Sequence, residues 1–176
     1  MKNSRTLLAA LGAAWMLSTA ALAGNDGVPV TPTVQNAAYS SGNAIGGMQQ
    51  VPLFRNSYLT HSGLLDLVQV TSKGGSTTPI TFYVFDTLPV ATTCTDKSAF
   101  TLGAADIAKL AVQPFTLTPA ATTGTSASSA QLVQVGSVSN QDNPTTSFIY
   151  VCPVVGGTVT PASTSDLVFK YSVSTD

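Results

Sequence analysis

The feature that most constrains this chain is an alternation of apolar and polar residues with a period of two. It is clearest in DLVFKYSVS, residues 166–174. Successive side chains of a strand point to opposite faces, so this pattern predicts a strand with one face on a core. The residues expected to face inward are Leu167, Phe169, Tyr171 and Val173. Those expected to face outward are Val168, Lys170 and Ser172.

Two further segments are predicted to form a β-hairpin. Residues 63–72, GLLDLVQVTS, place Leu64, Val68 and Val70 on one apolar face. The glycine pair in KGGSTT, residues 73–78, indicates a turn, and residues 79–88, PITFYVFDTL, follow as the partner strand. The second strand is apolar on both faces, which favours a central position covered from each side.

Composition supports the same fold class. The chain contains no Glu, has few Lys and Gln, and is rich in Thr, Ser, Val and Ala, and branched residues such as Val and Thr favour sheets over helices. Further strands are expected at 114–119, 131–139 and 146–155, and a flexible loop at 120–130. The one helix candidate, 98–112, begins with Ser98 as a cap and has apolar residues at helical spacing, namely Ala104, Ile107, Ala108 and Ala111. We therefore predict an all-β chain, a single antiparallel β-sandwich of jelly-roll type with one short helix.

The first residues resemble a secretory signal. Lys2 and Arg5 precede an apolar run from Leu7 to Leu17, and Ala21-Leu22-Ala23 offers a cleavage site before Gly24. We expect a signal peptide at 1–23, a flexible N-terminal arm at 24–37 and the β-sandwich domain at 38–176. The mature chain is then periplasmic, on the cell surface or extracellular. No later segment reaches the ~20 apolar residues that a membrane-spanning helix needs.

The chain has two cysteines, Cys94 and Cys152. In an exported protein an even pair most often forms a structural disulfide, which here closes a loop of roughly 60 residues and is worth about 4 kcal/mol in the chain-entropy model. The alternatives are two unpaired thiols or a chemical role. Redox chemistry is disfavoured because no C-x-x-C spacing occurs, and two thiols with the single His61 are too few ligands for a closed zinc site. No metal or cofactor is expected.

Charge argues against a nucleic-acid partner. Seven Lys and Arg stand against eight acidic residues, for a net charge of −1, and cleavage of the signal removes two of the positive charges. The basic patch that binds phosphate backbones is therefore missing.

Candidate catalytic groups have competing structural interpretations. His61 lies near Ser57, Ser62 and Asp66, but no G-x-S-x-G elbow is present, so we interpret it as a loop histidine. Several acidic residues about ten positions apart suggest two further hypotheses, the acid pair of a glycosidase or a calcium site, although calcium ligands usually gather in one loop. These residues are Asp66, Asp86, Asp96 and Asp106, of which Asp86 and Asp96 are expected to accept backbone N–H bonds in turns. No catalytic residue is assigned.

Ligand binding offers two further candidates. Most aromatic residues lie in strands and are expected in the core. Tyr39 and Tyr58 lie in predicted loops, so they are the better candidates for binding a sugar. The pairs Gly46-Gly47 and Gly74-Gly75 fit turns and match no phosphate-binding fingerprint.

Three stretches together resemble a family of bacteriophage virion structural proteins, small β-sandwich subunits of the capsid or decoration type. They are AYSSGNAIGG (38–47), SGLLDLVQVTSKGGSTTPITFYVFDTLP (62–89) with DKSAFTLGAADIAKL (96–110), and SFIYVCPVVGGTVTPASTSDLVFKYSV (147–173). The matching phrases are FDTLP at 85–89, DKSAF at 96–100, ADIAKL at 105–110 and SDL at 165–167. The leader and the cysteine pair depart from that family, so the resemblance implies an exported relative.

These observations predict a non-enzymatic, exported structural or adhesive protein that acts by assembly or surface contact. Its partner is expected to be another copy of itself or a cell-surface or extracellular molecule. The alternative is a secreted carbohydrate- or ligand-binding module, with or without calcium. A hydrolase built on His61 ranks last.

Overall fold

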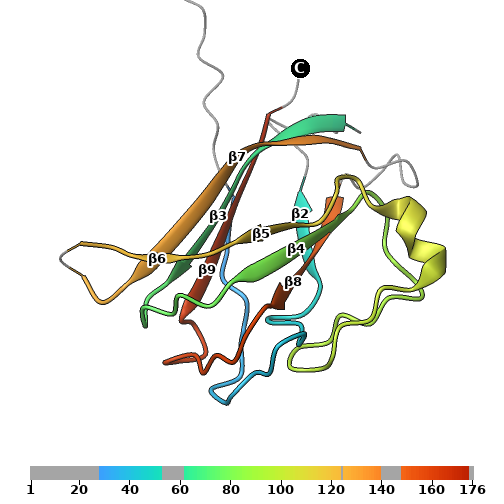
Figure 1. The fold of residues 1–176 in the computed structure, drawn as a ribbon. Helices are drawn as coiled ribbons and strands as arrows, with labels where there is room; N and C mark the ends of the chain where they lie inside the picture. The colour runs from blue at the N-terminus through green and yellow to red at the C-terminus, as the bar shows by residue number, and fades with distance from the viewer. Residues whose placement is uncertain (1–27, 53–61, 124, 140–147, 175–176) are drawn as a thin grey trace, which may run out of the picture.

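The computed structural model describes residues 28–52, 62–123, 125–139 and 148–174. Within these ranges the chain forms strands, one short 3-10 helix and the loops between them (Figure 1). The elements are β1 (Val28–Val30), β2 (Gln49–Pro52), β3 (Ser62–Ser72), β4 (Ile80–Phe85), η1 (Ala104–Lys109), β5 (Phe115–Leu117), β6 (Ala120–Ala121), β7 (Ser128–Ser139), β8 (Phe148–Val155) and β9 (Leu167–Ser174). Among the described residues, no helix has both the length and the apolar character that crossing a bilayer requires.

The strands make two antiparallel sheets that face each other. The first sheet has the order β1-β9-β3-β7-β6, and the second has the order β2-β8-β4-β5. The hydrophobic core fills the space between them and draws buried side chains from both sheets. The prediction of an all-β antiparallel sandwich with one short helix is confirmed.

Aromatic side chains join the two sheets across the core. Phe82 of β4 meets Phe169 of β9 edge-to-face, with ring centroids 5.5 Å apart, and stacks on Phe115 of β5 at the same distance. Phe82 and Phe169 are fully buried. Since β4 and β9 belong to different sheets, this contact fixes how the sheets pack.

The central position predicted for residues 79–88 is confirmed. β4 lies between β8 and β5, and its Ile80, Phe82 and Val84 enter the core between the sheets. Tyr83 and Phe85 point the other way, into a second apolar cluster on the outer face of the same sheet. A strand that is apolar on both faces is thus covered on both faces.

The alternation predicted for β9 holds over most of its length. Leu167, Phe169 and Tyr171 are buried, and Val173 is half-buried against the core. Ser172 was expected to face outward but is buried. It pairs with Leu67, where the register of the neighbouring strand β3 shifts.

The face assigned to β3 is wrong at its first residue. A bulge between Leu65 and Leu67 shifts the register. Because one extra residue reverses which side chains face the core, Leu65 joins Val68 and Val70 inside, and Leu64 is exposed. A strict period of two could not place both ends of this strand on the correct face.

The predicted hairpin between residues 63–72 and 79–88 does not form. β3 pairs with β7 and β9, whereas β4 pairs with β5 and β8 in the other sheet. The backbone N–H groups of Lys73 and Gly74 donate to Asp166, to its carbonyl and its carboxylate respectively. These bonds anchor the turn beside the start of β9 and direct the chain across to the second sheet.

The predicted helix is shorter than expected and turns a different face inward. η1 covers Ala104–Lys109, has no side-chain cap and begins after Gly103 rather than at Ser98. Of the predicted apolar face, Ala104, Ile107 and Ala108 are exposed and only Ala111, beyond the helix, packs against the core. The buried residue of the helix is Asp106, whose hydrogen bonds are described below.

The predicted flexible arm is corrected where the structure describes it. Val28–Val30 form β1, which pairs with Tyr171–Phe169 of β9. Val34 is buried in the core, and its N–H donates to the carbonyl of Thr164. Val28–Val30 therefore belong to the first sheet and Val34 to the core, because β9 leaves an edge that this segment pairs. The predicted signal at 1–23 and residues 24–27 lie outside the described residues.

Candidate functional site

Residues 86–114 join β4 directly to its neighbour β5 in the second sheet, and we call this segment the excursion. It leaves β4, includes η1 and returns as β5 (Figure 1). Its middle part pairs with the segment before β2: Lys97 N–H donates to the carbonyl of Ala44, and Phe100 N–H donates to that of Gly42. The excursion is thus attached to the body of the protein along its length.

A disulfide fastens the excursion to the second sheet. Cys94 of the excursion bonds to Cys152 of β8, with Cα atoms 6.1 Å apart, so the predicted pairing is confirmed. The fully buried Cys152 lies in the second apolar cluster beside Phe85. Tyr83 and Phe100 meet in the same cluster with ring centroids 4.2 Å apart. The excursion therefore covers the outer face of the sheet with packed side chains as well as with a covalent bond.

Asp106 holds the two halves of the excursion together. Its fully buried carboxylate accepts hydrogen bonds from the N–H groups of Val90 (3.1 Å) and Ala91 (2.7 Å) and from the Thr92 hydroxyl (2.9 Å). Lys109 lies 3.3 Å from it and also donates to the Leu88 carbonyl. Burial alone raises the pKa of Asp106, but these hydrogen bonds outweigh it and hold the pKa well below its usual range.

Asp96 has a similar role beside the disulfide. Its carboxylate accepts from the Gly46 N–H (2.7 Å) and from the Tyr39 hydroxyl (2.8 Å). Asp96 thus accepts a backbone N–H bond as expected, but the donor lies 50 residues away rather than in its own turn. The same hydroxyl accepts from the Gln35 N–H. Burial, the largest cause, and the neighbouring Asp96 carboxylate raise the pKa of Tyr39 to about 12, against the Gln35 bond, which lowers it.

A third aspartate organises loops near the start of β9. Asp166 accepts from the Ser72 hydroxyl (3.1 Å) and from the N–H groups of Gly74 (2.6 Å) and Ala162 (2.9 Å). Sequence reasoning did not assign roles to Asp106 and Asp166. Asp in a loop commonly accepts nearby backbone N–H bonds, as Asp166 does from Ala162. The other donors to Asp106 and Asp166 described here are 14 to 94 residues away in the sequence.

The excursion exposes three large apolar side chains. Leu88 is 52% exposed, Val90 79% and Ile107 56%. The Asp106–Lys109 unit bonds to the backbone of Leu88 and of Val90, and Ile107 follows Asp106 directly. We call these three residues the apolar patch. It is held on a locked backbone and is the candidate functional site.

The remaining predicted candidates do not form a site in the described residues. Tyr39, a predicted sugar-binding residue, is fully buried in the core, because its hydroxyl finds a partner in Asp96 and its ring packs between the sheets. Tyr58 and His61 lie outside the described residues. Among the residues described, no three His, Cys, Asp or Glu side chains gather as metal ligands would.

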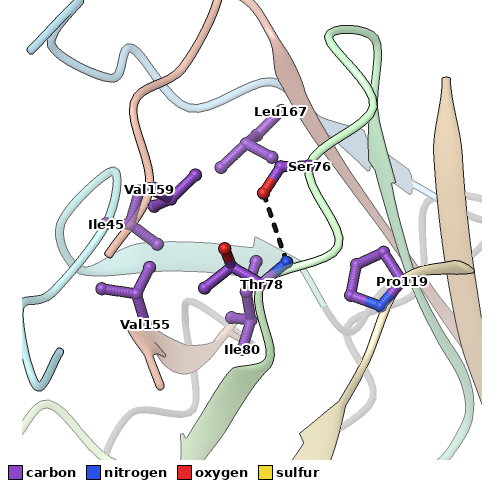
Figure 2. A pocket seen from close by; sticks show the side chains of 8 residues that line it. All are labelled: Ile45, Ser76, Thr78, Ile80, Pro119, Val155, Val159 and Leu167. Carbon is purple, nitrogen blue, oxygen red and sulfur yellow. Dashed lines mark hydrogen bonds between the residues drawn. The ribbon is translucent and has the colours of Figure 1, made fainter. Parts of the chain in front are cut away.

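A small hollow lies at one end of the sandwich (Figure 2). The space that the centre of a water molecule can occupy there is about 10 Å³, close to the minimum for one water. Its lining consists of Ile45, Ser76, Thr78, Ile80, Pro119, Val155, Val159 and Leu167. In this conformation it has no room for an organic ligand.

Comparison with known proteins adds no relative: no family model, no curated protein and no solved structure matches this chain.

Proposed function

We propose that this chain is an exported, non-enzymatic structural or adhesive protein that acts by surface contact. Its partner is another copy of itself or a cell-surface or extracellular molecule. The observation that carries the proposal is the apolar patch on the excursion, where three large apolar side chains face solvent. Exposed apolar residues that occur together are typical of protein contact sites.

The way the patch is held supports a binding role. An unconstrained loop would be free to turn such side chains inward, whereas this one is fixed by the Cys94–Cys152 bond and by the buried Asp106 carboxylate. A surface that is already ordered loses less conformational entropy on binding. The cost of exposing Leu88, Val90 and Ile107 in the free protein is then recovered in the complex.

The predicted export signal and the disulfide favour a location outside the cytoplasm. A structural disulfide such as Cys94–Cys152 persists where the surroundings are oxidising. The resemblance to phage virion subunits concerns the fold rather than the location, and it supports a sandwich that works through its surface. A structural or adhesive role is consistent with these three features and requires no catalytic group.

The test is retention of the purified mature protein on intact cells of the producing organism. Val90→Ser combined with Ile107→Ser is expected to reduce retention several-fold at an unchanged urea midpoint, since both side chains are exposed. Leu64→Ser, at an exposed apolar residue of β3 outside the patch, is the matched control and is expected to bind like the wild type. Retention of the double variant at the wild-type level would contradict the proposal.

A further inference from the structure

The first sheet has an open edge along β7. On one side β7 pairs with β3 over ten residue pairs. On the other side, β6 pairs only Ala120 and Ala121 with Ser129 and Ser128 (Figure 1). From Ala130 onward, no strand among the described residues pairs with this side of β7. A row of backbone N–H and C=O groups is therefore available to another strand.

The other edge strands of the two sheets carry or adjoin prolines. β1 contains Pro29 and β2 contains Pro52. β5 is three residues long and lies between Pro114 and Pro119. Proline has no N–H to donate and is a common device that prevents edge-to-edge pairing. The sequence of β7, SSAQLVQVGSVS, has neither proline nor a charged residue.

The side chain of Leu132 gives a second, independent observation. Leu132 pairs with Val68, and directly opposed residues of an antiparallel pair point to the same face of the sheet. Val68 is fully buried in the core, yet Leu132 is 36% exposed. Leu132 thus faces the core side of the sheet and stays exposed at the open edge. One more strand beside β7 would cover it.

We propose that β7 pairs antiparallel with β7 of a second copy of this chain, joining the two first sheets into one continuous sheet across a two-fold axis. This inference deepens the proposed function by naming the surface used for self-assembly. Residues Ala130–Val138 supply the pairing groups, and Leu132 of each copy is covered by the other.

We commit to a second copy as the partner, because it presents the same unpaired and uncharged edge. In a two-fold antiparallel pair each residue of one strand faces a residue of the same segment. Since the segment is uncharged, no register places like charges opposite each other. Its Val, Leu and Gln content also favours an extended strand.

The test measures self-association of the mature protein by sedimentation equilibrium over a concentration series. Gln131 and Ser137 of β7 are exposed, so Gln131→Lys with Ser137→Lys adds like charges to the new interface. The double variant is expected to weaken dimerisation by at least about ten-fold, because opposed like charges destabilise a strand pair. The matched control, Gln50→Lys with Thr116→Lys, adds the same charges at exposed residues of β2 and β5 and is expected to dimerise like the wild type.

Hydrogen exchange locates the contact. In the wild type, amides of residues 130–138 are expected to gain protection as the protein concentration rises, and those of β2 are not. A wild type that stays monomeric at millimolar concentration overturns the inference, as does a β7 variant that dimerises like the wild type. Neither result bears on the apolar patch, because cell retention of Val90→Ser with Ile107→Ser is measured separately.

Discussion

Removing the disulfide is the perturbation with the most directly calculable effect. Cys94 and Cys152 are 58 residues apart in the sequence. In the chain-entropy model, cross-linking a loop of that length destabilises the unfolded state by about 4 kcal/mol at 25 °C. A domain of this size has a total stability of roughly 5–15 kcal/mol. The Cys94→Ala/Cys152→Ala variant is therefore expected to lose a large share of its free energy of unfolding.

Equilibrium urea unfolding, followed by circular dichroism, measures this loss. The midpoint is expected to fall by roughly 2 M if the urea dependence is about 2 kcal/mol per M. The urea dependence itself is expected to rise, because the unfolded chain without the link exposes more surface. Wild-type protein reduced before unfolding is the control and should coincide with the double variant.

A loss below about 1 kcal/mol would refute this reasoning. It would mean that the link does not constrain the unfolded chain, and that the excursion is held mainly by its hydrogen bonds and packing. A second observable separates the two contributions. In the reduced protein, amide exchange is expected to rise first in the excursion near Cys94, while β9, which the disulfide does not touch, keeps its protection.

Three further outcomes follow from single groups. Folding lowers the pKa of Asp106, so this carboxylate stabilises the folded protein at a pH above the pKa that it has in the unfolded chain. That stabilisation is lost as the pH falls towards the lower pKa of the folded protein. In Asp106→Asn, the urea midpoint should therefore fall less steeply below about pH 4 than it does in the wild type. Folding raises the pKa of Tyr39 from 10.0 to about 12, so the stability of the protein should decline as the pH rises between these two values. In a series of unfolding measurements at alkaline pH, Tyr39→Phe should make that decline shallower. Gly75 has a φ of +77°, and a Cβ there would lie 2.2 Å from the Ser126 carbonyl oxygen. At Gly42 the φ is also positive but a Cβ would meet open space, so Gly42→Ala should cost only about 1–2 kcal/mol of stability. Gly75→Ala should therefore lower the thermal unfolding temperature more than Gly42→Ala does.

Local patterns in the sequence predicted the elements that depend on local physics. The alternation in β9 placed Leu167, Phe169 and Tyr171 in the core, because a strand's two faces follow directly from its period. The double-sided apolar character of β4 likewise indicated its central position. The cysteine pairing could be predicted because a chain with two cysteines has a single possible intramolecular disulfide.

What the sequence did not reveal depends on non-local contacts. The bulge between Leu65 and Leu67 reverses a face, and it is set by pairing with β7 and β9 rather than by β3 alone. The turn after β3 leads to the other sheet because Asp166, some ninety residues later, binds it. The apolar patch could not be predicted for the same reason. The helical spacing predicts Ile107 as a core residue, whereas in the structure the buried residue of this helix is Asp106.

The central claim is that this sandwich is exported and is completed by its disulfide outside the cytoplasm. Intact-mass spectrometry of the protein recovered from cells that express the full chain tests it most directly. The account predicts a chain that begins at Gly24, is recovered outside the cytoplasm and lacks the two thiol hydrogens of Cys94 and Cys152. A full-length chain in the cytoplasm with both thiols free would contradict it.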